Sequence, residues 1–391
     1  MEYMYESCAG LDVHQNNVVA CVLYGPLTST RPKKEEKRFD TTTSGLNALK
    51  EWLSSFDCQV VAMESTGVYW KPIWHVLQAD FQLILANPRK IKAIPGHKTD
   101  KKDAEWIAKL MRIDLIPASF VPEETIQDLR DLTRSRKSLV ESCNKEKNKI
   151  HKILQTAGIK MTTYIEDIFG ASGRNLLEML INGEILTEET IAANVYTSLK
   201  KKIPQLVDAL NGFVRSHHRF MLEQEYDMIL AYEKTIKNME ERIDQVLENY
   251  QEEVAVLDEL PGIDRKAAAV IIAEIGTDMT QFPSVEHLAS WAGLCPGNNE
   301  SSGKRKSTHI TKGNAYLKKV LCQAAFAASR SKNTKFKAHF YRIKQNRGTQ
   351  KAVVATAHSL LKTIYTLLST KQHYQEFGED YDKKKNVLEA S

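Results

Sequence analysis

Gln59-Val60-Val61-Ala62-Met63-Glu64 is a short apolar run that ends in an acid, and this stretch decides the fold. A second apolar run, from Cys8 to Leu23, contains Asp12. Short apolar runs rich in β-branched residues predict buried strands. An unpaired carboxylate beside such a strand costs free energy, so Asp12 and Glu64 are expected to be paired, neutralised or bound to a metal.

The residues around these two runs alternate strand and helix patterns. We expect Ser44 to cap the first helix. Three antiparallel strands followed by helix, strand, helix, strand and helix are the order of a ribonuclease H-like fold, which is an α/β fold. In that order the first and fourth strands pair at the sheet centre, which would make Asp12 and Glu64 neighbours. The predicted strands are Cys8 to Asp12, Val18 to Tyr24, Lys37 to Thr41, Cys58 to Met63 and Phe81 to Ala86, and the predicted helices are Gly45 to Ser55 and Val68 to Gln78.

Two more acids, Asp100 and Asp103, lie three residues apart at the start of another predicted helix and so share one face. A hard cation such as Mg²⁺ takes oxygen ligands, and two metals about 3.5–4 Å apart can stabilise the attacking and leaving oxygens of an in-line displacement. The four carboxylates therefore predict a Mg²⁺ site that acts on phosphodiesters. The alternative is that Asp100 and Asp103 only complement the positive end of the helix dipole.

Basic residues surround these two aspartates. The chain from Asn87 to Arg112 contains eight Lys or Arg and three acids. Lys98, Lys101 and Lys102 would hold phosphates beside the metals. Alternatively, these lysines neutralise the acids as exposed ion pairs, which contribute little stability.

The net charge of +5 conceals an asymmetry along the chain. Residues 301–375 contain 16 Lys or Arg and no acid, whereas the rest of the chain contains 38 basic and 49 acidic residues. A long acid-free segment indicates a surface that binds a polyanion such as double-stranded DNA. The residues assigned to nucleic-acid contact in this segment are Lys304, Arg305, Lys306, Lys312, Lys318 and Lys319.

Length and composition limit the remaining possibilities. A chain of 391 residues predicts two or three domains. No apolar stretch approaches the roughly 18 residues of a membrane span, and the amino terminus lacks a signal-peptide pattern. We therefore expect a cytoplasmic protein without a membrane partner. The six cysteines form no C-x-x-C pair, which argues against zinc and a disulfide framework, and most should fill cores.

The middle of the chain is predicted to be helical. Glu123 to Leu154 and Phe220 to Leu257 each carry a narrow apolar stripe, which suggests an antiparallel pair or an intermolecular coiled coil. Residues 158–216 between them should form small helices. We expect three domains: residues 1–115 with the carboxylates, a helical region over residues 116–256, and residues 257–391, which are mostly helical.

The last predicted domain opens with a possible nucleic-acid contact. A helix, the turn Leu260-Pro261-Gly262-Ile263 and an alanine-rich helix resemble a helix-hairpin-helix, in which Gly262 and the turn amides could meet a phosphate. The alternative is a structural helical hairpin. Further on, Ser301 and Ser302 stand before three cations in a predicted flexible loop, followed by a helix over Asn314 to Ser329. Cations beside a serine favour phosphate binding, although such a loop is often only a loop.

These motifs together, in this order, resemble the DEDD transposases of the IS110 insertion-sequence family. The resemblance covers about residues 1–155 and about residues 255–345, and the middle region looks longer than the family requires. The motifs that carry it are Gly10-Leu11-Asp12-Val13-His14, Met63-Glu64-Ser65-Thr66-Gly67, Lys98-Thr99-Asp100-Lys101-Lys102-Asp103-Ala104, Leu260-Pro261-Gly262-Ile263, Asn299-Glu300-Ser301-Ser302-Gly303-Lys304 and Lys312-Gly313-Asn314.

The resemblance implies a RuvC-like domain whose tetrad Asp12, Glu64, Asp100 and Asp103 binds Mg²⁺. It also implies a second domain with a nucleophilic serine, which matches Ser301 here, with Ser302 not excluded. Family members cut and rejoin donor and target DNA through a phosphoserine link, in a composite site formed between subunits of a homo-oligomer, dimer or tetramer. A noncoding bridge RNA guides them.

Two other functions stay open at the level of sequence. The first is a metal-dependent, Holliday-junction-type nuclease in which the carboxylates activate water and Ser301 has no role. The second is a nucleic-acid-binding protein that has lost catalysis.

Overall fold

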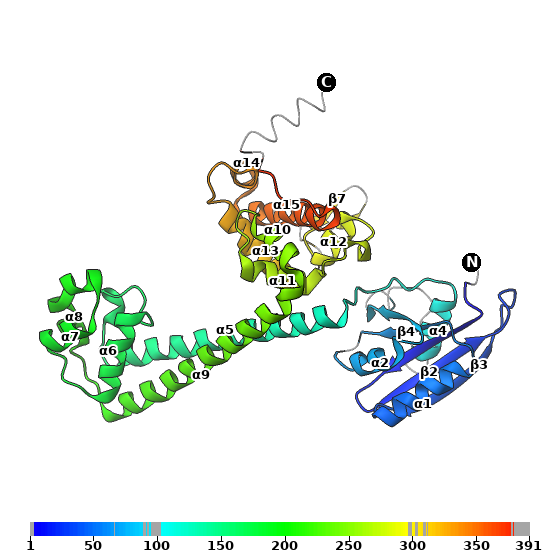
Figure 1. The fold of residues 1–391 in the computed structure, drawn as a ribbon, viewed down its shortest axis with the longest axis horizontal. Helices are drawn as coiled ribbons and strands as arrows, with labels where there is room; N and C mark the ends of the chain where they lie inside the picture. Colours follow the sequence, from blue (N-terminus) through cyan, green and yellow to red (C-terminus); the bar gives the residue numbers. More distant parts are fainter. Residues whose placement is uncertain are drawn as a thin grey trace, which may run out of the picture. The chain divides into compact units, whose positions relative to one another are not determined.

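The computed structural model of the chain describes residues 4–65, 67–88, 91, 94, 103–295, 299–301, 304–307, 310, 312–376 and 378. It divides into two compact units, Met1–Val121 and Pro122–Ser391, which are described separately. The first unit is α/β and the second is mostly helical, as the sequence predicts (Figure 1).

The first unit is built on a five-stranded sheet with strand order β3-β2-β1-β4-β5. Strands β1, β2 and β3 are antiparallel, whereas β1, β4 and β5 are parallel. The predicted pairing of the first and fourth strands is confirmed. The strands are β1 (Ser7–Val13), β2 (Asn17–Tyr24), β3 (Lys33–Asp40), β4 (Val60–Glu64) and β5 (Gln82–Ala86).

Helices cover both faces of this sheet. Leu11 and Met63 belong to one core with α1 (Thr43–Ser54) and α2 (Trp70–Leu77). Cys8 and Ala62 belong to the other core, with α4 (Asp103–Arg112). Successive side chains point to opposite faces of a strand, so the two central strands, β1 and β4, are apolar on both sides. This is why their sequences are continuously hydrophobic.

Two details of this unit differ from the sequence-based expectation. Strand β3 begins at Lys33, four residues before the predicted start, because its charged residues pair with β2 at the sheet edge and only Phe39 is buried. Charged side chains are common on edge strands, where they hinder pairing with other chains. The cap of α1 is Thr42 and not Ser44, since the Thr42 hydroxyl accepts the amide of Gly45 at 3.2 Å.

Two long helices, α5 (Glu124–Thr156) and α9 (Ser216–Leu247), pack side by side in the second unit (Figure 1). Their ion pairs show that they are antiparallel: Arg136 meets Glu240, Lys147 meets Glu233, and Lys149 meets Glu225. The antiparallel pair predicted from the two apolar stripes is therefore confirmed.

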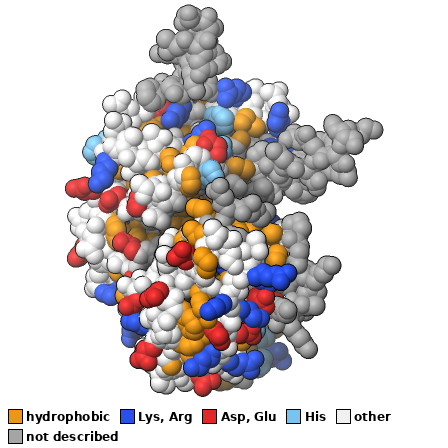
Figure 2. All heavy atoms as spheres, turned by 90° about the vertical axis from the view of Figure 1, so that its right-hand side faces the viewer, with side chains coloured by type: hydrophobic (Ala, Val, Ile, Leu, Met, Phe, Trp, Pro, Cys, Tyr) orange, Lys and Arg blue, Asp and Glu red, His pale blue; other side chains and the backbone are white. Residues whose placement is uncertain are grey.

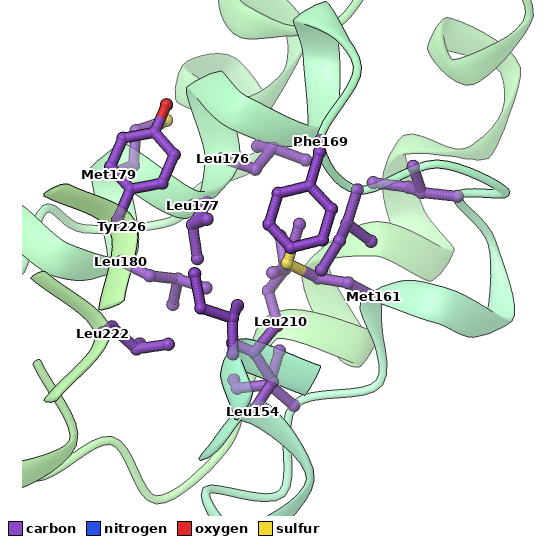
Figure 3. Packing of buried hydrophobic residues seen from close by; sticks show 14 of the residues in the cluster. Leu154, Met161, Phe169, Leu176, Leu177, Met179, Leu180, Leu210, Leu222 and Tyr226 are labelled. Carbon is purple, nitrogen blue, oxygen red and sulfur yellow. The ribbon is translucent and has the colours of Figure 1, made fainter. Parts of the chain in front are cut away.

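The residues between these helices fold onto one end of the pair. They form α6 (Ala171–Asn182), α7 (Glu188–Asn194), α8 (Ile203–Leu210) and the short 3-10 helices Met161–Thr163 and Thr197–Lys202. The labelled side chains of Figure 3, among them Phe169, Leu177 and Leu210, point toward one another in a shared core with Leu154 and Leu222 of the long helices. The small helices predicted for residues 158–216 are confirmed.

The remaining helices pack near the other end of α5. They are α10 (Gln251–Asp258), α11 (Arg265–Ile275), α12 (Val285–Ala292), α13 (Ala315–Ala328), α14 (Lys335–Arg347) and α15 (Thr349–Thr370), with one-turn 3-10 helices at Glu248–Tyr250 and Met279–Gln281. Helix α13 matches the predicted helix from Asn314, which caps it by accepting the amides of Tyr316 and Leu317.

The serine segment contains a hairpin where a flexible loop was expected. Strand β6 (Asn299–Ser301) pairs antiparallel with β7 (Lys304–Ser307), with Ser301 opposite Lys304. Only two residues of sequence, Ser302 and Gly303, separate the strands, and a two-residue link that contains Gly is typical of tight hairpins. The sequence did not predict this strand pair, because both strands are polar and neither alternates apolar and polar residues.

The surface and the cysteines complete the description. On the face drawn in Figure 2, Lys and Arg side chains lie among Asp and Glu side chains, so this face carries no single-sign field. Among the helices that the structure describes, none combines the length and the apolarity needed to span a bilayer. All six cysteines are free thiols and four of them are buried, as predicted.

Candidate functional site

Asp12 and Glu64 lie side by side at one end of the sheet in the first unit. The parallel register pairs Leu11 with Met63, so the next residues, Asp12 and Glu64, are at the same level on adjacent strands. Side chains two residues apart on a strand point to the same face. Glu64 therefore points to the same face as Ala62, and Asp12 to the same face as Cys8, and both Ala62 and Cys8 pack against α4. The two carboxylates therefore point to the face of the sheet that α4 covers, at the carboxyl ends of β1 and β4.

Helix α4 runs antiparallel to β1 and brings Asp103 to the same end. The Met4 amide donates to the Arg112 carbonyl at 2.9 Å, and the Cys8 thiol lies 3.5 Å from the Ala108 carbonyl. A Cβ on Gly10 would lie 2.2 Å from the Ala104 carbonyl oxygen. Going along β1 toward its carboxyl end, the contacts therefore move toward the amino terminus of α4. Asp12, at that end of β1, lies near the first residue of the helix, Asp103.

The environment of these acids suits a reactive site open to solvent. The Asp12 side chain is 26% exposed, and Glu64 and Asp103 are half-buried. Asp103 lies one turn before Ile107, which packs against the sheet, so its side chain starts on the sheet-facing side of the helix. The strand register and the direction of α4 thus bring three of the four predicted carboxylates to the same end of the sheet. Asp100, Lys98, Lys101 and Lys102 lie outside the described residues. Within the described residues, no three His, Cys, Asp or Glu side chains are grouped so that they could hold a metal ion.

His14 is a neighbour of Asp12 that the sequence reasoning missed. Its Nε2 atom lies 3.1 Å from Asp12 Oδ2, and the histidine is more than half exposed. The spacing was the available signal: His14 follows directly after the end of β1 at Val13, two residues beyond Asp12, and an extended chain puts residues two apart on the same side. An imidazole in this position can orient the Asp12 carboxylate.

The serine hairpin is followed by a tightly packed anchor in the second unit. The backbone amide of Asn314 donates to the backbone carbonyl of Trp291 at 3.0 Å. A Cβ on Gly313 would lie 2.2 Å from the Gly293 amide nitrogen and 2.5 Å from the Trp291 carbonyl oxygen, so the position requires glycine. The Lys312-Gly313-Asn314 motif therefore fixes the chain against the end of α12 at a point five residues after the hairpin ends.

Beneath this anchor lies a fully buried carboxylate, Glu274 of α11, which the sequence reasoning left without a role. Arg134 donates to its two oxygens at 2.8 and 2.7 Å, and Asn314 Nδ2 donates to Oε2 at 2.6 Å. Arg130 donates to the carbonyls of Ala273 and Glu274 at 2.9 and 2.8 Å. An acid inside the apolar run Val270 to Ile275 was the available signal.

The predicted basic contacts have mixed surroundings. Lys312 is exposed and Lys318 half-buried, whereas Lys319 forms an ion pair of 3.0 Å with Glu141 of α5. Lys304, Arg305 and Lys306 lie in β7, where the structure describes the backbone only. Arg134 and Lys137 lie 4.4 and 4.2 Å from the ring centre of Tyr316, a cation–π pair of contacts beside α13.

Gly262 occupies an exposed turn, but the structure explains it by packing. Its φ of +85° is the left-handed region that glycine tolerates, and a Cβ would lie 2.3 Å from the Ala324 carbonyl oxygen of α13. At the start of α11, the Asp264 carboxylate already accepts the amide of Ala267 at 2.8 Å. A phosphate would have to compete with this cap.

Comparisons with known proteins agree with this arrangement. Residues 9–159 match the model of the DEDD transposase domain of IS110, described as a transposase. Residues 254–341 match the model described as Transposase IS116/IS110/IS902 family. The two family models thus identify an insertion-sequence transposase, a class of DNA-recombining enzyme. The chain belongs to the IS110 family.

Individual relatives extend the match over most of the chain. A transposase for insertion sequence element IS1111A from Coxiella burnetii is 24% identical over 83% of this chain and 81% of the relative. A pilin gene-inverting protein from Moraxella bovis is 26% identical over 92% of this chain and 95% of the relative. An IS110 protein of Streptomyces coelicolor is 40% identical over 18% of each chain.

Proposed function

We propose that this transposase exchanges DNA strands through a covalent phosphoserine link, with Ser301 as nucleophile and the carboxylates of the first unit as the metal site. The observation that supports the proposal most strongly is that Asp12, Glu64 and the first residue of α4, Asp103, all lie at the same end of the sheet. Strand order and pairing support our assignment of this unit as a RuvC-like, ribonuclease H-like domain. Asp100 would complete the tetrad from the segment before α4.

The donor set suits a hard divalent cation, because carboxylate oxygens are the ligands that Mg²⁺ prefers. The Gly10 backbone supports this fit, since only a residue without a Cβ lets α4 approach closely enough to bring Asp103 to Asp12. Asp12, Glu64, Asp100 and Asp103 would hold Mg²⁺, which would stabilise negative charge on the phosphate. His14 would keep the Asp12 carboxylate oriented.

In the covalent step, the Ser301 hydroxyl oxygen forms a bond to phosphorus while the bond from phosphorus to one deoxyribose oxygen breaks. The serine proton is lost to solvent, and the leaving oxygen takes up a proton. Attack by a hydroxyl of another strand then reverses the link and releases the serine. Lys304, Arg305 and Lys306, next to Ser301 in the hairpin, would hold the phosphate.

Variants of the serines test the nucleophile. On supercoiled plasmid carrying the element ends, Ser301→Ala should abolish the covalent protein–DNA adduct, while Ser302→Ala and the control Ser307→Ala should retain it. Asp12→Asn should abolish cutting altogether. If Ser301→Ala still cuts DNA and yields free ends, the water-using nuclease is correct. If Asp12→Asn leaves the product yield unchanged, the chain only binds nucleic acid.

We also propose a composite site in a homo-oligomer, with carboxylates and serine from different subunits. Mixing the Ser301→Ala and Asp12→Asn chains tests this idea directly. Each variant is inactive alone, but a mixed oligomer would contain sites with all functional groups, so adduct formation should return. No recovery in a mixture that forms hetero-oligomers would contradict a site shared between subunits.

A noncoding bridge RNA would supply sequence recognition for donor and target DNA. Basic side chains that reach phosphates position a nucleic acid without reading its bases, so base pairing by an RNA would complement them. The two relatives named as pilin gene-inverting proteins support DNA recombination as the reaction. Recombination that persists after ribonuclease treatment and without added RNA would contradict guidance.

The proposed parts act as follows: residues 1–115 hold the metal, residues 116–256 form a coiled-coil region with an insertion, and residues 257–391 carry the serine and a helix-hairpin-helix around Gly262. Lys98, Lys101, Lys102, Lys312, Lys318 and Lys319 would contact nucleic acid. We place the reaction in the cytoplasm, where chromosomal DNA is accessible in a cell without a nucleus.

A further inference from the structure

Glu274 joins three segments that are far apart in the sequence. Its carboxylate accepts hydrogen bonds from Arg134 of α5 and from Asn314, which caps α13 and lies seven residues after the end of the serine hairpin at Ser307. Its own backbone carbonyl accepts from Arg130, so α5 also caps the last turn of α11. Every contact lies within the second unit.

Stability alone does not account for a charge in this place. The Glu274 side chain is 0% exposed, and burying an ion pair costs desolvation energy that well-packed apolar residues would avoid. The geometry is specific. The Arg134 guanidinium donates to both carboxylate oxygens, and one of them, Oε2, also accepts a hydrogen bond from Asn314. A buried charge network of this kind selects one arrangement of its partners.

The arrangement it selects is the position of the anchor behind the serine hairpin. Asn314 uses all its polar atoms: Oδ1 accepts two amides of α13, Nδ2 donates to Glu274, and its own amide donates to Trp291. The preceding Gly313 is packed against Gly293 without room for a Cβ. The end of the hairpin segment therefore cannot shift without breaking a bond to a buried charge.

We propose that Glu274 is a positioning residue, which with Arg134 and Asn314 holds the serine hairpin in a fixed place relative to α5. The inference rests on the proposed role of Ser301. It adds that the hydrogen bond between Asn314 and Glu274 sets the rate of the covalent step, because nucleophilic attack tolerates displacement of only about 1 Å.

Two single variants weaken this bond without removing the cap: one opposes it with a second carboxylate, and the other leaves one acceptor oxygen for Arg134 and Asn314 to share. Asn314→Asp keeps an oxygen for the amides of α13 but turns a carboxylate toward Glu274. Glu274→Gln keeps the side-chain volume but removes the charge. The double variant Asn314→Asp with Glu274→Gln reverses the direction of the same hydrogen bond, since the amide now donates to the carboxylate at position 314. Thr334→Ala, which removes the cap of α14, is the matched control.

The readouts are the rate of covalent adduct formation, the Kd for DNA, and hydrogen exchange of the peptide that covers residues 304–318. Each single variant should form adduct at least about 100-fold more slowly with a Kd within about threefold of wild type, and exchange faster in that peptide. The double variant should recover most of the rate. Thr334→Ala should change neither the rate nor the exchange.

Two results would overturn the inference. One is wild-type adduct rates in both single variants. The other is a parallel loss of DNA binding and adduct formation that the double variant does not repair, because that is the behaviour of a merely structural network. If wild-type protein forms no adduct, the serine assignment fails separately. In that case, unchanged hydrogen exchange over residues 304–318 in the single variants would refute the proposal that Glu274 positions the serine hairpin.

Discussion

Replacing Gly10 by alanine should separate α4 from the sheet and disable the site. A Cβ at this position would lie 2.2 Å from the Ala104 carbonyl oxygen, 2.4 Å from the Ala108 amide nitrogen and 2.9 Å from Ile107 Cβ. Two of these three atoms are helix backbone, which cannot rotate away as the end of a long side chain can. The whole helix must therefore move.

The displacement and its cost can be worked from these contacts. An ordinary carbon–oxygen contact is about 1 Å longer than 2.2 Å, so α4 must retreat by about 1 Å. Overpacking of a core by a methyl group costs about 1–3 kcal/mol. Because α4 starts at Asp103, the same shift moves that carboxylate from Asp12, and a misplacement of about 1 Å lowers the rate of a reaction about 100-fold.

The matched control is Cys8→Ala, on the same strand and facing the same helix. It leaves a small gap and destabilises the unit without pushing α4 outward. Hydrogen exchange of α4 and recombination yield from a plasmid should separate the two variants: Gly10→Ala should lose both protection and activity, whereas Cys8→Ala should keep its activity. Full activity in a folded Gly10→Ala protein would refute the derived position of α4.

Three further predictions concern charge, thiols and salt. Hydrogen bonds from Lys109 and Lys34 lower the pKa of Glu105 from 4.5 to about 2. Glu105→Gln should therefore destabilise the first unit by about 1–2 kcal/mol above pH 4.5, and this loss should fade as the pH falls toward 2. Hydrogen exchange of α4 at pH 7 and pH 3 checks this prediction. The same difference between wild type and variant at both pH values would contradict it. Burial raises the pKa of Cys8, Cys21 and Cys58 from 9.0 to about 12. Because the thiolate is the reactive form, alkylation at pH 8 should be about 1,000-fold slower than in urea, and equal rates would refute their burial. DNA affinity should fall steeply with salt, and replacing Lys312 by Gln should reduce the log–log slope by about 0.9 if it contacts one phosphate, whereas a salt-independent affinity would remove the electrostatic argument.

Hydrophobic pattern predicted the parts of the fold that one stretch of sequence determines. The strand runs around Asp12 and Glu64 are short and continuously apolar, whereas the paired long helices and the helix after Asn314 carry a clear period of 3.6 residues. The β1–β4 pairing followed from element order. These features could be predicted because the residues that each element buries lie within one continuous stretch of sequence.

Features that depend on a distant partner could not be predicted in this way. Strand β3 extends to Lys33 only because β2 supplies its hydrogen bonds, and the serine hairpin has no apolar alternation. The role of Gly313 needs the position of Gly293, which is 20 residues away in the sequence. Glu274 is an ordinary acid in the sequence, and only the fold brings Arg134 and Asn314 to it.

The central claim is that Asp12, Glu64 and Asp103 converge to hold a divalent metal, and Mn²⁺ binding to the full chain tests it without reference to activity. Free Mn²⁺ is followed by electron paramagnetic resonance during titration of wild type, Asp12→Asn, Glu64→Gln and the control Asp80→Asn, whose residue pairs with Lys50 away from the site. The predicted result is that Asp12→Asn and Glu64→Gln each weaken binding at least about 10-fold, with the control unchanged. Equal binding by all four proteins would contradict the claim.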